Sequence, residues 1–217
     1  MRRADLYQRR DEAELSRAAL AEARAVTHRA SPEIGMLVDA LEAGLLVRQG
    51  DLDSAEQLLR GAEARLMPDG GFSPMTGDHG IAIVGALKAT LAVARGEPDV
   101  AAAALAVAYP AALATQDMPI LSMIGVGAAE VAGARGDHRD SAMLLGAAAR
   151  LRGAEDPTEP RIAALNRDGR AALGDEAYGE AYAAGWALDT QAARARVDPA
   201  HRSGPAPVIE SGQARLA

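Results

Sequence analysis

Apolar and polar positions alternate along this chain with the spacing of helices rather than strands. Residues 4–30 place Leu15, Leu20 and Val26 among charged residues at near-helical intervals. This pattern predicts one helix, the second half of a hairpin whose first half is missing. Long runs of β-branched residues, which would indicate strands, are missing throughout. We therefore expect an all-α protein.

Three breaks of similar composition divide the helical pattern. Each has a glycine, which tolerates the left-handed backbone that ends a helix, followed by an acidic residue that suits the start of the next. Small alanines follow each break, where two helices must approach closely. The breaks lie at Gly50-Asp51, Gly96-Glu97 and Gly136-Asp137. They predict a repeated helical hairpin.

The intervals between these glycines are 46 and 40 residues. Tetratricopeptide repeats recur about every 34 residues, and longer helical repeats about every 40–47. We expect tetratricopeptide-like hairpins with stretched helices or loops. The first helices of the hairpins are predicted at residues 32–48, 79–95 and 119–135.

The remaining segments extend this array. Residues 68–78 hold several prolines and glycines and predict an irregular loop. Tyr109-Pro110 is expected to bend or end its helix, and a further helix is predicted at 161–173. The fold we expect is a tetratricopeptide-like α-solenoid over residues 1–197 with a C-terminal capping helix. Residues 198–217 lose the periodicity and predict a disordered tail.

The composition narrows the classes of function. A net charge of −7 argues against direct nucleic-acid binding, because phosphate contacts need clustered cations. Four N-terminal arginines interleave with acidic residues and form either a solvated helical face or a basic arm. They are Arg2, Arg3, Arg9 and Arg10.

Cysteine is absent, which excludes disulfides, thiolate catalysis and cysteine-based zinc sites. No apolar N-terminal stretch resembles a signal peptide, and no run reaches the ~20 apolar residues that span a bilayer. We expect a cytoplasmic protein without membrane contact.

No motif predicts catalysis, a cofactor or a metal. Asp137-His138 with Asp140 can hold a cation but reads better as a solvent-facing turn. Gly125-Val126-Gly127 begins like a dinucleotide fingerprint, yet Glu130 stands where the third glycine belongs. Close helix packing explains these glycines better. We expect a protein that is not an enzyme, with no catalytic residue, no metal ligand and no cofactor.

Three isolated charges are the best candidates for a binding surface. Glu42 and Lys88 lie 8 residues before the turn glycines of their hairpins, and Glu130 lies 6 before its own. First helices line the concave surface of tetratricopeptide arrays, so these charges can share one groove. The alternative is a structural ion pair between neighbouring helices.

A pocket inside the curve is a second possibility for the same surface. We expect Met36 and Met123 to line it, because the flexible thioether suits irregular ligands. Tyr178, Tyr182 and Trp186, at four-residue intervals on one helical face, form either an aromatic ligand box or a cap that closes the open end of the stack.

The segment from Arg135 to Val197 resembles the end of the helical-repeat region in actinobacterial antibiotic-regulatory (SARP) and LuxR-type ATP-binding transcription regulators. The residues that carry the resemblance are Arg135-Gly136-Asp137, Ala142 to Ala148, Leu173 to Tyr178, Ala181 to Leu188, Ala192 and Ala195. The nucleotide-binding motif GxxxxGK[ST] and a basic helix-turn-helix, both typical of these regulators, are missing from the sequence.

The resemblance implies a sensor or scaffold segment of a regulatory system. We therefore expect a non-catalytic binding module whose concave groove takes a peptide, a regulator domain or a second copy of the chain. The alternative is a small-ligand sensor with its pocket inside the helical array.

Overall fold

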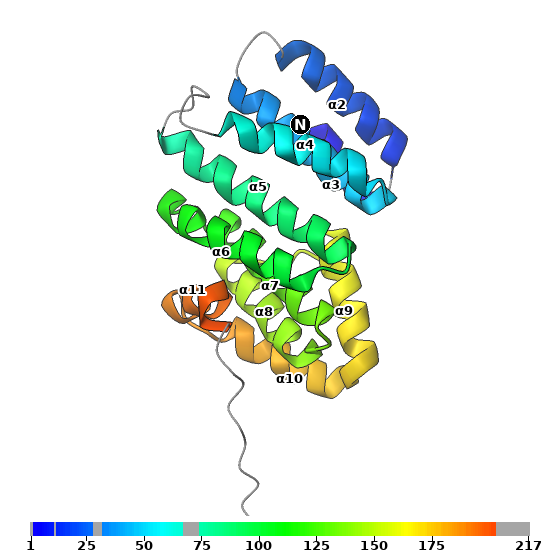
Figure 1. Ribbon diagram of the computed structural model, residues 1–217. Coiled ribbons are helices and arrows are strands. Elements are labelled where there is room, and N and C mark those ends of the chain that lie inside the picture. Colours follow the sequence, from blue (N-terminus) through cyan, green and yellow to red (C-terminus); the bar gives the residue numbers. More distant parts are fainter. Residues whose placement is uncertain (1, 11, 28–31, 67–73, 203–217) are drawn as a thin grey trace, which may run out of the picture.

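The computed structural model describes residues 2–10, 12–27, 32–66 and 74–202. Within these ranges the chain is helical and has no strand, as expected (Figure 1). The helices are α1 (Arg2–Arg9), α2 (Ala13–Thr27), α3 (Pro32–Gln49), α4 (Leu52–Arg65), α5 (Pro74–Ala94), α6 (Pro98–Thr115), α7 (Met118–Ala134), α8 (His138–Arg152), α9 (Pro160–Leu173), α10 (Asp175–Trp186) and α11 (Thr190–Val197), followed by the 3-10 turn η2 (Pro199–Arg202).

The helices pack as successive hairpins. Helix α3 pairs with α4, α5 with α6, and α7 with α8, while α5 also contacts both α3 and α7 (Figure 1). The first helices of the three hairpins therefore form one row. Helices α9 and α10 then pack against α8, at the end of the array opposite α2.

The turns between paired helices have the predicted geometry. Gly50, Gly96 and Gly136 adopt φ of +79°, +76° and +81°, the left-handed region in which glycine carries no Cβ penalty. After Gly136 the backbone N–H of Asp137 donates to the carbonyl of Ala132 at 2.9 Å, a Schellman ending. The Asp137 carboxylate then accepts the N–H three residues later and caps the next helix.

The prediction of a single helix over residues 4–30 is wrong. Helix α1 ends at Arg9 and α2 begins at Ala13, so this segment is a hairpin of its own. The Ser16 hydroxyl donates to the carbonyl of Ala4 at 3.1 Å, and both residues are buried. Folding α1 back on α2 removes Ala4 and Leu20 from water, a gain that local periodicity does not reveal.

Two other boundaries differ from the prediction. Helix α5 begins at Pro74, so it includes residues that were expected to belong to the irregular loop; residues 67–73 lie outside the described ranges. Pro110 does not end its helix, because α6 continues to Thr115. Pro110 and Ala106, whose carbonyl loses its helical donor, both lie on the exposed side, where water replaces that bond.

The C-terminal region is also more divided than expected. The capping segment forms two helices, α10 and α11, with Asp189 capping the second. The predicted tail begins at Asp198, but η2 packs against α6 and Pro199 is buried. The rest of the predicted tail, residues 203–217, lies outside the described ranges.

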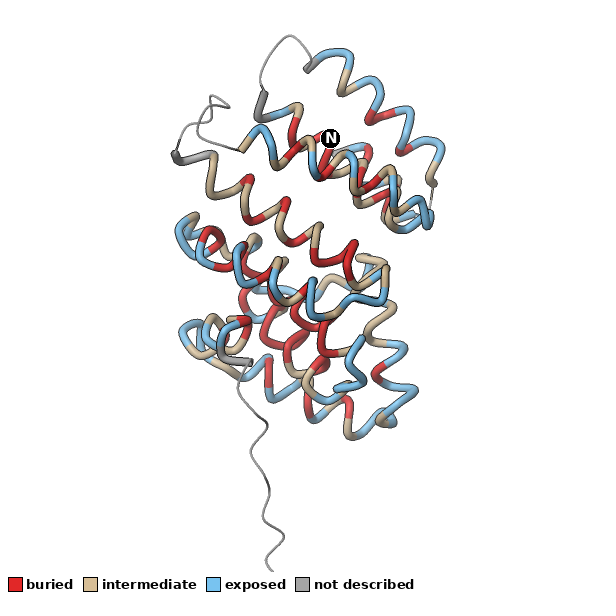
Figure 2. Tube along the Cα trace, in the orientation of Figure 1, coloured by how far each residue is buried: buried red, intermediate tan, exposed pale blue. Residues whose placement is uncertain are grey.

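Burial is concentrated in α7 and α8 (Figure 2). Two glycines allow α10 to cross α8 at backbone contact. A Cβ on Gly146 would meet the carbonyl oxygen of Tyr182, and a Cβ on Gly185 would meet that of Met143, both well under the 3.0 Å that real Cβ atoms keep. These helices therefore pack without intervening side chains.

Among the described helices, α6 alone is long and apolar enough to cross a membrane by length and composition. Six of its residues are buried, and it packs against α5 and α7. In this structure α6 is therefore a packed helix of the array.

Candidate functional site

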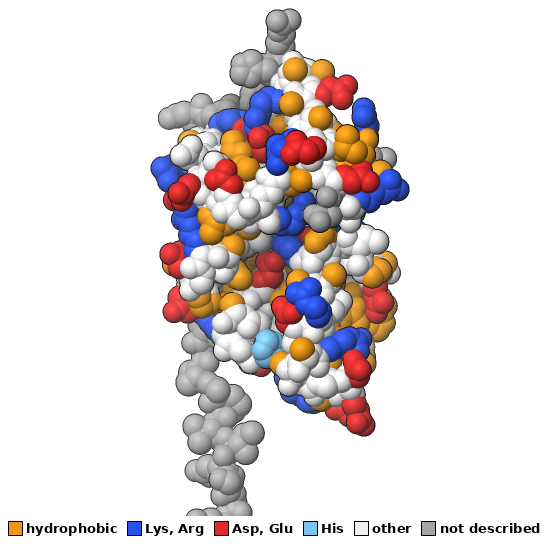
Figure 3. All heavy atoms as spheres, turned by 90° about the vertical axis from the view of Figure 1, so that its right-hand side faces the viewer, with side chains coloured by type: hydrophobic (Ala, Val, Ile, Leu, Met, Phe, Trp, Pro, Cys, Tyr) orange, Lys and Arg blue, Asp and Glu red, His pale blue; other side chains and the backbone are white. Residues whose placement is uncertain are grey.

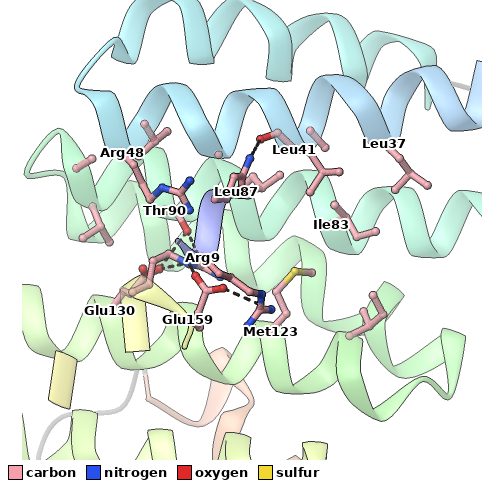
Figure 4. A pocket seen from close by; sticks show the side chains of 18 residues that line it. Arg9, Leu37, Leu41, Arg48, Ile83, Leu87, Thr90, Met123, Glu130 and Glu159 are labelled. Atoms are coloured by element: carbon pink, nitrogen blue, oxygen red, sulfur yellow. Dashed lines mark hydrogen bonds and ion pairs between the residues drawn. The ribbon is translucent and has the colours of Figure 1, made fainter. Parts of the chain in front are cut away.

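A pocket of about 480 Å³, here called the central pocket, opens in the row formed by α3, α5 and α7. Helix α1 and the start of α9 complete its wall. Most of the lining is aliphatic, and these side chains extend toward one end of the pocket (Figure 4). The principal ones are Leu37, Leu41, Ile83, Leu87, Ile120 and Met123.

One helical register explains which residues of the row face the pocket. Leu37, Ile83 and Met123 each lie 13 residues before the turn glycine of their hairpin. The residues 6 before the glycines line the pocket as well: Gly44, Thr90 and Glu130. Three successive first helices thus present the same face to one cavity.

Charged and polar side chains gather at the other end of the central pocket, which we call the polar end (Figure 4). They come from five different helices or their flanking residues. The group consists of Arg9, Arg48, Thr90, Glu130, Glu159 and Arg161.

Glu130 is the most deeply buried carboxyl group at the polar end, with 8% of the residue exposed. Its Oε2 accepts a hydrogen bond from the Thr90 hydroxyl at 3.0 Å and lies 3.6 Å from Nη1 of Arg161. Burial raises the pKa of Glu130 above the usual carboxyl value, and Arg161 and Thr90 oppose this effect only in part.

Arg161 joins three elements at this point. Its Nη1 donates to the Thr90 hydroxyl at 2.9 Å, and its Nε donates to Oε1 of Glu159 at 3.2 Å. Burial lowers the pKa of Arg161, but Glu130 and Glu159 outweigh that effect and raise it. Its guanidinium therefore stays charged inside the fold.

Helix α1 crosses the concave side and reaches the loop between α8 and α9. Nη1 of Arg9 donates to both carboxylate oxygens of Asp156, at 2.8 and 3.0 Å, and to the Thr158 hydroxyl at 3.0 Å. Gln8 donates to the carbonyl of Leu41 at 3.0 Å on the other side. The two ends of the described chain thus meet across the central pocket.

Asp156 is the main acceptor in this crossing, with a side chain only 8% exposed. Arg152 also pairs with it at 2.9 Å. Burial by itself raises the pKa of Asp156, but the hydrogen bonds from Arg9 and Thr158 and the charges of Arg9 and Arg152 outweigh it and lower the pKa below the usual value.

The structure brings together two of the five residues predicted for the groove. Glu130 and Met123 line the central pocket. Met36 is buried in the core among α3, α4 and α5. Glu42 pairs with Arg24 of α2 at 2.8 Å.

Lys88 also lies away from the central pocket, because its Nζ pairs with Glu63 of α4 at 2.7 Å. Glu42 and Lys88 occupy the register two residues earlier than Glu130. Two residues turn a helix by about 200°, so the side chains point to opposite sides. The inference that these three charges share one groove is therefore corrected. For Lys88 the alternative of an ion pair between helices describes the structure.

The sequence interpretation missed several residues of the polar end. Thr90 was detectable, because it shares the register of Glu130 relative to the turn glycines. Arg9, Glu159 and Arg161 come from the two ends of the array, and no periodic signal relates them to the row. Arg9 belongs neither to a solvated face nor to a free basic arm, since its side chain is only 23% exposed and contacts Asp156.

The predicted aromatic face does not contribute to the central pocket. Tyr178 is buried, its ring stacks on that of Tyr182 at 6.3 Å, and Arg170 lies 4.7 Å above it. Both tyrosines pack at the end of the array formed by α8, α9 and α10. Trp186 is 39% exposed, so the three rings do not form one box.

Acidic and basic side chains are interspersed on the face seen in Figure 3, and neither charge forms a continuous patch there. No three histidine, aspartate or glutamate side chains in the described ranges are placed to hold a metal ion. Gly125 lies against Ala148 and Val197 in the core, so it serves helix packing.

Comparison of the chain with protein-family models, with curated proteins and with solved structures finds no match. The resemblance of residues 135–197 to the regulators therefore rests on the quoted residues alone.

Proposed function

We propose that this chain is a non-catalytic, tetratricopeptide-like binding module that takes a small molecule in the central pocket. The observation that carries the proposal is the shared register of α3, α5 and α7, which directs equivalent positions of three hairpins into one cavity. A packed core needs no such cavity, and apolar cavities weaken a fold.

The size and lining of the central pocket fit a ligand of this kind. Small-molecule sites usually measure about 300–1,000 Å³ and are mostly apolar with a few placed polar groups. The central pocket has about 480 Å³, an aliphatic wall and one polar end.

The enclosure favours a small molecule over a peptide or a protein domain in this groove. An extended peptide needs a channel that stays open along its length. Helix α1 crosses the concave side, and Arg9 ties it to Asp156. Of the two alternatives that the sequence left open, the geometry supports the small-ligand sensor better.

A sensor role in a transcription-regulator system is the wider context that we propose. The support is the resemblance of residues 135–197. The contact between Arg9 and Asp156 adds a physical route, because a ligand beside it can alter how the two ends of the array are joined.

Titration with the neutral fluorescent probe N-phenylnaphthylamine tests the proposal. We expect saturable binding of one probe per chain, detected as increased fluorescence. Ile83→Trp should abolish it by filling the apolar end. Lys88→Met is the matched control, since it lies on the same helix but outside the pocket.

Circular dichroism and melting must show that Ile83→Trp remains folded. Probe binding that persists in a folded Ile83→Trp protein would contradict the proposal. Absence of any saturable binding to the wild-type chain would contradict it as well.

A further inference from the structure

The central pocket has chemistry that narrows its ligand. We infer that the pocket takes an aliphatic carboxylic acid, with its chain on the wall of α3, α5 and α7 and its carboxylate at the polar end beside Arg161. This inference rests on the proposed function, because it names the ligand class of the same site.

The wall specifies the body of the ligand. The described lining residues outside the polar end are aliphatic or small apart from Gln8, and no aromatic ring is among them. Aromatic ligands gain from stacking on rings, and this wall offers no such partner. Leucine, isoleucine, valine and methionine side chains favour an aliphatic chain through area burial alone.

The polar end specifies the head group. Three guanidinium groups, those of Arg9, Arg48 and Arg161, line the pocket, against two carboxyl groups among the described lining residues. A ligand cation would add positive charge beside three guanidinium groups. A carboxylate adds the charge that this end has less of.

Arg161 supplies specific donors. A guanidinium has five N–H donors, and Arg161 uses Nε toward Glu159 and Nη1 toward Thr90 and Glu130. Its Nη2 has no acceptor among the described residues. With a side chain 23% exposed, Arg161 is held in place yet still accessible from the pocket.

A neutral head group fits this end less well. An alcohol accepts one hydrogen bond of ordinary strength, whereas a carboxylate accepts charge-assisted bonds about twice as strong. Guanidinium–carboxylate pairs also form two parallel bonds, which fix orientation. Arg161 is therefore the residue we expect to discriminate between ligands of equal chain length.

The test compares three probes of one chain length: dodecanoate, dodecanol and dodecylamine. Each displaces N-phenylnaphthylamine from the wild-type chain at concentrations below micelle formation. We expect dodecanoate to bind about tenfold more tightly than dodecanol, equivalent to about 1.4 kcal/mol, and dodecylamine to bind most weakly. This comparison needs no variant.

Arg161→Met then locates the preference. It should bring dodecanoate to within about threefold of dodecanol while dodecanol affinity stays unchanged, and Arg161→Lys should restore part of the difference. The matched control is Arg167→Met on the same helix, where the side chain is 73% exposed and pairs with Asp168. It should change neither affinity.

The outcomes separate the inference from the proposed function. Equal binding of dodecanoate and dodecanol, or a preference for dodecylamine, overturns the carboxylate inference while the pocket remains a binding site. A carboxylate preference that survives in a folded Arg161→Met protein also overturns it. If neither the probes nor N-phenylnaphthylamine bind, the proposed function itself fails.

Discussion

The two ends of the array are held together in different ways. At the C-terminal end, α8 and α10 cross at backbone contact through Gly146 and Gly185. At the N-terminal end, long side chains bridge neighbouring helices. Asp39 of α3 pairs with Arg24 of α2 and with Arg65 of α4, and Lys88 of α5 pairs with Glu63.

This difference explains where the central pocket lies. Glycine and alanine contacts bring helices close and leave no space between them. Helices joined by arginine, lysine and leucine side chains stay farther apart. The pocket opens between α3 of the N-terminal end and α7 of the C-terminal end, with α5 between them. Its enclosure then depends on α1 and the start of α9.

The largest expected effect tests the close crossing. Gly185→Ala should lower the free energy of unfolding by about 2–3 kcal/mol, because its Cβ would overlap the backbone of α8. Gly179→Ala lies on the same helix with nothing within 4 Å of the new Cβ, so it should stabilise by up to about 1 kcal/mol. Urea unfolding measures both. Effects of the same sign would show that α10 does not approach α8 this closely.

The next effect should be equal at both ends of the array. Gly50→Val and Gly136→Val each place a branched side chain at positive φ, and each should cost about 1–2 kcal/mol. Neither Cβ meets another atom within 4 Å, so backbone strain is the main cause. Thermal melting compares the two variants. An unchanged melting temperature for either one means that its turn is not left-handed.

A smaller effect tests the ionic contacts of the N-terminal end. Asp39→Asn should cost about 1 kcal/mol, because a side chain only 8% exposed loses charge-assisted bonds to two half-exposed arginines. Glu14→Gln removes an exposed pair with Arg17 and is the control, with little expected effect. Equal losses in urea unfolding would show that burial of Asp39 adds nothing.

Lys88→Ala should have a weaker effect still, about 0.5 kcal/mol or less. Lys88 and Glu63 have side chains 40% and 43% exposed, so the remaining carboxylate keeps its water. Probe binding to the central pocket should stay unchanged in this variant. A loss of probe affinity would place Lys88 at the pocket after all.

The pH dependence separates the two buried carboxyl groups of the central pocket and its crossing. Because burial raises the pKa of Glu130, the folded state holds this proton more tightly than the unfolded state does. Its contribution to stability is therefore greatest below the ordinary value of 4.5 and is lost as pH rises through the higher folded pKa. Urea unfolding from pH 4 upward should show that loss in the wild-type chain and not in Glu130→Gln.

Asp156 has the opposite sign. The hydrogen bonds from Arg9 and Thr158 keep its folded pKa below the ordinary 3.8, so its contribution is present above that value and is lost as pH falls. Asp156→Asn should reduce the acid sensitivity of the fold. A variant that keeps the full wild-type acid sensitivity would contradict this.

Local signals in the sequence were enough to predict much of the array. The turn glycines set the hairpins, since a left-handed residue at Gly50, Gly96 or Gly136 ends a helix wherever the rest of the chain lies. The apolar periodicity predicted the row of α3, α5 and α7. Glu130 was detectable as an isolated charge, and counting from the turn glycines would have separated its register from that of Lys88.

Only the tertiary structure decided how the central pocket is closed. Arg9 and Asp156 are 147 residues apart, and no periodicity relates positions at that separation. The break between α1 and α2, the crossing of α1 and the contact of Arg161 with Thr90 depend on burial shared among distant helices. Such burial is a property of the assembled fold, because each segment alone exposes the same side chains to water.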